Sequence, residues 1–229
     1  RDTEAKVKVA MAPPARPRPA SALRRFFGIF GDVRAWTSLF FMLLSLATGI
    51  FYFTFAIVGV SLSAGLAILI IGIPFFLSFI GLLRVIALGE GRLIEAMTGE
   101  RMPRRPVHPG PPRSFGARIL EMLRDVRTWT TLAYSVLMLA LGVAYFVIAT
   151  VGLSVGLAMV AGPLLEGARL VGLELPRGIE TNDAVLDGLV SHPVSLLFVA
   201  VLGVLLLTLL MHLARAIGRG HARLAKALL

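Results

Sequence analysis

The sequence contains no cysteine, which excludes disulfide bonds, thiolate metal sites and a cysteine nucleophile. Charged residues are also scarce, because they make up 16% of the 229 residues whereas ordinary soluble domains carry about 25%. Hydrophobic residues, by contrast, make up 57%. This is the composition of a membrane protein, and too few residues remain for a sizeable soluble domain beside the membrane-spanning part.

The longest run without Asp, Glu, Lys or Arg covers the 49 residues between Arg34 and Arg84. A transmembrane helix needs only about 20 apolar residues, so this run is long enough for two. Its centre, residues 59–63, is small and polar enough to form a turn. The run therefore predicts two antiparallel helices, near 36–58 and 64–87.

Two further charge-free runs lie in the second half of the chain. Residues 128–165 are sufficient for one full span and part of another, and residues 188–214 for one more. The apolar piece 152–164 either continues the third helix or lies at the far membrane interface. The predicted fold class is an all-α membrane protein whose four transmembrane helices form two helical hairpins.

Basic residues gather on one predicted side of the membrane. Of the 23 Lys and Arg, 21 lie in the arm before residue 35, in the segment 84–127 or in the tail from Arg215. The positive-inside rule therefore predicts that both termini are cytoplasmic. Orientation and attraction to anionic lipid headgroups then explain the net charge of +10. We accordingly expect a lipid bilayer, and no nucleic acid, as the partner of these charges.

The two predicted hairpins resemble each other in sequence. The segment DVRAWT at 32–37 recurs as DVRTWT at 125–130, an offset of 93 residues. Further identities at this offset include Leu46/Leu139, Gly49/Gly142, Tyr52/Tyr145 and Ser61/Ser154. The ends of the halves match at an offset of 131, in the pairs Arg84/Arg215, Gly89/Gly220 and Arg92/Arg223. The pattern indicates a duplicated hairpin with an insertion of about 38 residues on the outer side of the second copy.

This pattern divides the chain into four parts. Residues 1–20 are predicted to form a disordered, basic, Pro-rich arm, and residues 21–101 the first hairpin repeat. A Pro-rich cytoplasmic linker covers 102–113, and the second hairpin repeat covers 114–229 with the outer insertion at 152–194. An amphipathic segment at the start of each repeat is predicted to lie along the inner membrane interface.

Six residues near predicted helix ends are candidate anchors at the membrane interfaces. Trp and Tyr are enriched at these interfaces, and the charged end of an Arg side chain can reach the headgroups. The six are Trp36, Trp129, Tyr52, Tyr145, Arg84 and Arg215. Each tyrosine follows its tryptophan by 16 residues, or roughly 24 Å of helix, which predicts that it lies at the opposite membrane face.

The sequence offers little chemistry for catalysis. No two of the four histidines have the i, i+3 or i, i+4 spacing of a helical metal site, and His212 is expected to bond to backbone or water rather than to haem. Glu90 lies in a Gly-Glu-Gly stretch that lacks the other residues of a phosphate-binding loop. No charged residue falls near a predicted membrane midplane, which argues against a buried ion relay. We therefore predict no catalytic residue, no metal site and no cofactor.

The outer insertion carries an asymmetric group of charged residues. They could bind a cation, a peptide or a partner domain, and long loops are often functional. The simpler alternative is a solvated loop with a short amphipathic helix near 181–190. The candidate residues are Glu166, Arg169, Glu174, Arg177, Glu180, Asp183 and Asp187.

These features resemble the bacterial "putative sensor" membrane domain, which occurs at the N-terminus of some histidine kinases and also in standalone proteins. The resemblance covers residues 24–229. It rests on the RAW motif at 34–36, the GIP motif at 72–74, the exit helix 84–93 and the GIET motif at 178–181. It implies a duplicated hairpin in the bacterial inner membrane that acts as an input or regulatory module.

These 229 residues contain no phosphoacceptor or ATP-binding domain. We therefore predict a non-enzymatic, sensor-like or regulatory module without its own kinase domain, which passes its signal to a protein partner or a second copy. The helical segments 84–97 and 215–228 would report the packing of the hairpins inside the cell. The alternative is an accessory structural subunit of a larger membrane protein complex, which the missing catalytic motifs would also explain.

Overall fold

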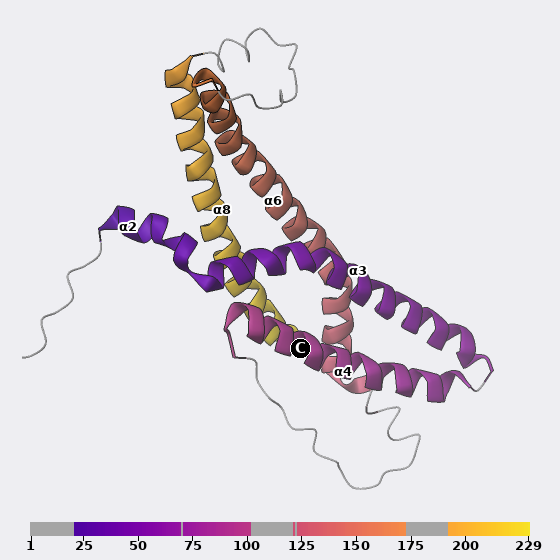
Figure 1. The fold of residues 1–229 in the computed structure, drawn as a ribbon. Coiled ribbons are helices and arrows are strands. Elements are labelled where there is room, and N and C mark those ends of the chain that lie inside the picture. Colours follow the sequence, from indigo (N-terminus) through magenta and orange to yellow (C-terminus); the bar gives the residue numbers. More distant parts are fainter. Residues whose placement is uncertain (1–20, 70, 102–120, 122, 173–191) are drawn as a thin grey trace, which may run out of the picture.

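The fold was obtained as a computed structural model, which describes residues 21–69, 71–101, 121, 123–172 and 192–229 (Figure 1). Its long helices are α3 (Val33–Ala67), α4 (Gly72–Thr98), α6 (Val126–Leu170) and α8 (Pro193–Leu228). Each of these four is long and apolar enough to cross a membrane. No strand occurs within the described ranges. The predicted all-α class with four apolar helices is confirmed, and this is the architecture of a multi-pass membrane protein.

The first hairpin turns later than the sequence predicts. α3 continues through 59–63 and ends at Ala67, so the chain turns between Ala67 and the start of α4 at Gly72. Gly59 serves packing instead, because a Cβ there would overlap the ring of Phe79 on α4. The predicted turn at 59–63 is therefore wrong. Small residues in membrane helices mark close helix contacts as well as turns, and here they mark a contact.

The second hairpin is longer than the first. Residues 152–164 continue α6, and the alternative of a separate interfacial segment is excluded. α6 and α8 have 45 and 36 residues, whereas α3 and α4 have 35 and 27. Part of the extra length of the second copy is therefore helix rather than loop. Pro163 lies inside α6, where its missing N–H leaves one backbone carbonyl without its helical partner.

A short helix precedes α3. α2 (Ala22–Phe27) is capped by Ser21, whose hydroxyl accepts a hydrogen bond from the backbone N–H of Arg24. A 3-10 turn, η1 (Gly28–Gly31), then leads into α3. This helical segment lies where the first interfacial helix is predicted. The corresponding segment before α6, residues 114–126, falls mostly outside the described residues.

The first helix of each hairpin starts in the same way. Asp32 and Asp125 are the N-caps of α3 and α6, and each carboxylate accepts a hydrogen bond of 3.0 Å from the backbone N–H two residues later. An N-cap carboxylate satisfies an otherwise unpaired donor and interacts favourably with the helix dipole. Trp36 and Trp129 each donate from Nε1 to the backbone carbonyl six residues earlier, at 2.8 Å. The shared sequence motif thus produces the same local structure twice.

The core lies between the two hairpins. α3 packs more extensively on α6 than on α4, its own hairpin partner. At their crossing, a Cβ on Gly49 would overlap the carbonyl oxygen of Met138, and a Cβ on Gly142 would overlap that of Ser45. Both Gly49/Gly142 and Ser45/Met138 are pairs at the offset of 93, so matched positions make matched contacts. Figure 1 shows the hairpins meeting in this region and diverging toward the end of α3 in one direction and the far end of α6 and α8 in the other.

Candidate functional site

An acidic side chain is buried among the helices. Glu90 of α4 is 1% exposed. It lies on the same face of α4 as the buried Leu83 and Ile94, because residues seven and four positions apart share a helix face. A buried carboxyl group is costly unless other groups form hydrogen bonds with it. The partners of Glu90 come from other helices.

Glu90 forms hydrogen bonds with two tyrosines. Tyr52 of α3 donates from Oη to Oε2 at 2.6 Å, and Tyr134 of α6 donates to Oε1 at 3.1 Å. Nε2 of His221 in α8 lies 3.1 Å from the same Tyr134 hydroxyl. With the single hydroxyl proton of Tyr134 donated to Glu90, the Tyr134 oxygen can accept a hydrogen bond from Nε2 of His221. Tyr52, Glu90, Tyr134 and His221 are called the buried polar cluster below.

Aromatic rings surround the imidazole of His221. The ring centroids of Phe41 and Tyr145 lie 4.9 Å and 5.7 Å from it, and Tyr145 meets it edge to face. Nδ1 of His221 has no hydrogen-bond partner among the described residues. Hydrogen bonds in such an apolar environment are strong, and each one that is lost is costly. The buried polar cluster is therefore sensitive to small relative movements of the helices.

Each of the four long helices contributes one residue to the cluster, and the contributions are related by the sequence repeat. Glu90 and His221 are matched at the offset of 131. The pairs at the offset of 93 are Tyr52/Tyr145 and Phe41/Tyr134. Matched positions of the two hairpins therefore meet at one place with different chemistry, a carboxyl group from one hairpin and an imidazole from the other.

Two ion pairs connect the hairpins outside the cluster. Arg84 of α4 binds Asp125 at 2.8 Å, and Arg215 of α8 binds Asp32 at 2.6 Å. The arginines are matched positions and so are the aspartates, so each hairpin holds the N-cap of the other with the same pair of residue types. The side chains are partly exposed, and each pair contributes at most about 1 kcal/mol. Their larger effect is on the register of one hairpin against the other.

The C-terminal ends of α4 and α8 also pack together. Ile94 belongs to the same buried cluster of apolar residues as Ala222 and Ala225, and Lys226 binds Glu100 at 3.1 Å. Both ends are uninterrupted continuations of the long apolar helices, as predicted for 84–97 and 215–228. The residues that follow the buried polar cluster along both helices thus form a joint contact.

Comparison with known families bears on what these contacts serve. The family model described as "Putative sensor" matches residues 41–229, which include the whole buried polar cluster. The chain belongs to this sensor family. No curated protein and no solved structure matches it significantly. The family description is that of a sensor-like module, in agreement with the resemblance seen in the motifs.

The four aromatic residues among the predicted interface anchors of this sensor-family chain fall into two groups. Trp36 and Trp129 lie at the surface and are about half exposed. Tyr52 is buried and bound to Glu90, and Tyr145 packs against a histidine of the cluster. The two tyrosines thus line the contact between the hairpins. Their distance along the helix from the tryptophans specifies a height but not the helix face on which they lie.

Two of the predicted outer-loop residues lie within the described ranges. Glu166 and Arg169 belong to the end of α6, where Arg169 binds Glu166 at 2.9 Å. Outside the described residues lie Glu174, Arg177, Glu180, Asp183 and Asp187. A binding role for this segment stays a prediction.

Sequence reasoning did not identify the buried polar cluster. It considers Glu90 only within a glycine-containing stretch and finds no charged residue near a membrane midplane, yet Glu90 is buried inside the helix bundle. Two signals were present in the sequence. Glu90 shares a helix face with apolar residues, and the matched pair Gly89/Gly220 is followed directly by the pair Glu90/His221.

The other histidine near the end of α8 behaves as predicted. Nε2 of His212 lies 3.1 Å from the backbone oxygen of Phe26, and the two rings stack. The expected bond to the backbone is confirmed. Across the described part of the chain, no group of three or more His, Asp and Glu could hold a metal ion.

Proposed function

We propose that the protein is a non-enzymatic, sensor-like regulatory module of a bacterial inner membrane, and that the packing of one hairpin against the other is its signalling variable. The observation that carries this proposal is the buried polar cluster, to which each long helix contributes one side chain. A signal that moves any one helix must stretch or break at least one of the three hydrogen bonds of the buried polar cluster. The membership of the chain in the sensor family supports the same interpretation.

The input is proposed to act from the outer side. α6 and α8 flank the charged segment 166–187, so a ligand or partner there can shift both helices of the second hairpin relative to the first. The shift reaches Tyr134 on α6 and His221 on α8, which bind to each other and, through Tyr134, to Glu90 on α4. A shift of the second hairpin is therefore transmitted to α4 of the first.

The output is proposed to leave through the cytoplasmic ends of α4 and α8. Ile94 lies one turn after Glu90, and Ala222 and Ala225 lie within about one turn after His221; all three belong to one buried apolar cluster. A change in the cluster thus alters the contact of the two helix ends, which a partner or a second copy could recognise. The 229 residues carry no ATP-binding or phosphoacceptor motif, so the chemistry of signalling is assigned to another domain or protein.

Electron-spin distance measurements on the full chain in lipid nanodiscs test the proposal. The absence of cysteine means that Ile68→Cys and Val171→Cys introduce the only two labelling sites. These residues are 87% and 84% exposed, and they end the first helix of each hairpin. Glu90→Gln replaces an ionisable carboxyl group with a neutral amide. We expect it to change the ratio of the populations with different inter-label distances by about tenfold or more.

The matched control is Glu95→Gln, which makes the same chemical change one turn and a half later on α4, outside the cluster. Tyr52→Phe is a second, milder test, since it removes one hydroxyl and retains the ring. Equal distance distributions in the wild type, Glu90→Gln and Tyr52→Phe would show that the cluster does not govern hairpin packing. Purification only as part of a stoichiometric complex would instead favour the accessory-subunit alternative.

A further inference from the structure

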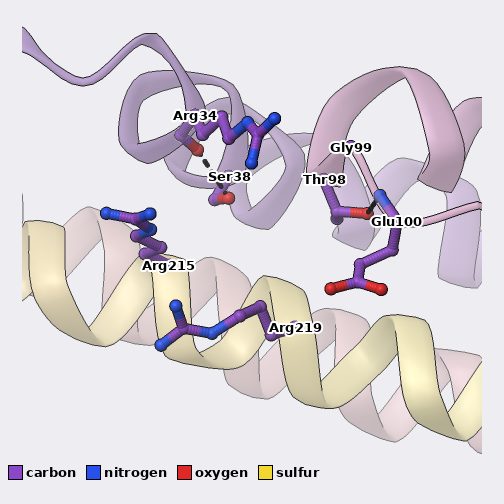
Figure 2. A pocket seen from close by; sticks show the side chains of 7 residues that line it. All are labelled: Arg34, Ser38, Thr98, Gly99, Glu100, Arg215 and Arg219. Atoms are coloured by element: carbon purple, nitrogen blue, oxygen red, sulfur yellow. Dashed lines mark hydrogen bonds between the residues drawn. The ribbon is translucent and has the colours of Figure 1, made fainter. Parts of the chain in front are cut away.

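A second polar feature lies where α3 begins and α4 ends. A cavity of about 110 Å³ opens there, and Figure 2 shows its lining side chains. The lining residues are Arg34 and Ser38 of α3, Thr98, Gly99 and Glu100 at the end of α4, and Arg215 and Arg219 of α8. Its volume has room for several water molecules, and therefore for a phosphate-sized group.

Two glycines shape this cavity. Gly218 allows α8 to approach α3, because a Cβ there would lie 2.9 Å from Oγ of Ser38. Gly99 ends α4 in the left-handed conformation, with φ of 73°, and directs the chain so that Glu100 faces α8. Ser38 and Thr98 are buried and bonded to carbonyls of their own helices, so they close the inner wall.

The charges around the cavity do not balance. Arg215 is paired with Asp32, and Glu100 is paired with Lys226. Arg34 and Arg219 have no carboxylate within ion-pair distance among the residues the structure describes. Two guanidinium groups without an ion-pair partner thus line a polar cavity. Arg side chains present several donors in a planar arrangement that matches the oxygens of a phosphate.

We propose that this cavity binds a phosphate group, with Arg34 and Arg219 as its charge-matched ligands and Arg215 as a third donor. The group can belong to a lipid headgroup or to a soluble phosphate, since both present the same oxygens. The carboxylate of Glu100 also faces the cavity, and its pairing with Lys226 reduces its repulsion of the anion. This site is separate from the buried polar cluster and does not depend on the proposed function.

The other hairpin provides an internal comparison. The positions matched to Arg34 and Arg215 are Arg127 and Arg84, and Arg84 forms with Asp125 the same ion pair that Arg215 forms with Asp32. The position matched to Arg219, however, is Leu88, which is 56% exposed. The third arginine is therefore not required by the repeated fold. Of these two matched positions, α8 alone carries an arginine, Arg219, and this arginine lines the polar cavity.

The experiment uses the full chain and two probes at low ionic strength, where screening is weak. Inorganic phosphate is titrated calorimetrically into the protein in phosphatidylcholine nanodiscs. Retention of phosphatidic acid over phosphatidylcholine is measured by native mass spectrometry of the detergent-solubilised protein. Each measurement is repeated with Arg219→Leu, which copies the other hairpin, with Arg34→Gln, and with the matched control Arg127→Gln.

We expect Arg219→Leu and Arg34→Gln each to weaken binding by about tenfold or more, and Arg127→Gln to leave it unchanged. Binding of inorganic phosphate assigns a soluble ligand, and selective retention of phosphatidic acid without it assigns a headgroup. The proposal is overturned if neither probe binds. It is also overturned if Arg127→Gln weakens binding as much as Arg219→Leu, because the effect would then be one of overall charge. The three substituted arginines, Arg34, Arg127 and Arg219, are exposed at the surface. Thermal unfolding of each variant verifies that it is folded.

Discussion

The glycines at the crossing of α3 and α6 allow a quantitative test of the hairpin interface. Gly49→Ala places a methyl group against the carbonyl oxygen of Met138, and Gly142→Ala places one against that of Ser45. A carbon atom needs about 3.3 Å from a carbonyl oxygen, so either change must separate the helices locally by roughly 1 Å. The hydroxyl of Ser45 lies 3.3 Å from the carbonyl oxygen of Gly142, and this weak contact is lost as well.

The expected cost follows from overpacking, which destabilises by about 1–3 kcal/mol. Gly→Ala also favours a helix by about 1 kcal/mol, and this gain must be removed from the comparison. Gly81→Ala on α4 supplies the reference, because a Cβ there meets nothing within 4 Å. Gly49→Ala and Gly142→Ala should each be less stable than Gly81→Ala by about 1–3 kcal/mol.

The double variant distinguishes this reasoning from a general effect of bulk. The two methyl groups push apart the same pair of helices. The separation that one methyl group causes therefore makes room for part of the second methyl group. The double variant should therefore cost less than the sum of the single variants, by about 0.5 kcal/mol or more. The assay is the free energy of unfolding in a denaturing-detergent titration of the full chain. Additive costs, or a Gly49→Ala variant as stable as Gly81→Ala, would refute the close crossing.

Three further substitutions test the starts of the two hairpins. Asp125→Asn retains an N-cap acceptor but removes the charge that binds Arg84, so it should cost at most about 1 kcal/mol, and the loss should vanish at high salt in a thermal unfolding series. Asp125→Ala should cost about 1 kcal/mol more at all salt concentrations, because it also removes the cap. Trp36→Phe removes the hydrogen bond from Nε1 to the carbonyl of Phe30 and should lower stability by about 1 kcal/mol. An unchanged melting temperature for Trp36→Phe would contradict the role given to that bond.

The number and class of the helices could be predicted because membrane spans are determined by local hydropathy. The charge-free run 35–83 is long enough for two helices wherever it turns, so the count survives the error in the turn. The turn itself depends on a contact between Gly59 and Phe79, which are 20 residues apart, and local composition does not report it. The rise per residue of a helix predicts how far along α3 Tyr52 lies. Whether a side chain at that level faces the membrane or another helix depends on how the second hairpin packs on α3.

Sequence motifs do not reveal the buried polar cluster, for a related physical reason. Its residues come from four helices, and no two of them lie near each other in the sequence. A catalytic or metal motif would have shown a fixed local spacing, whereas this site is created by packing alone. The repeat was the only long-range information in the sequence, and it does connect Glu90 with His221.

The meeting of Glu90 and His221 shows what a single chain permits that a dimer of identical hairpins does not. In such a dimer, each residue at the twofold axis would face its own copy, and an acid there would face another acid. Two like side chains cannot complement each other as donor and acceptor without sharing a proton. Joining the two hairpins in one polypeptide lets the matched positions diverge, so that an imidazole and a carboxyl group can share one tyrosine between them.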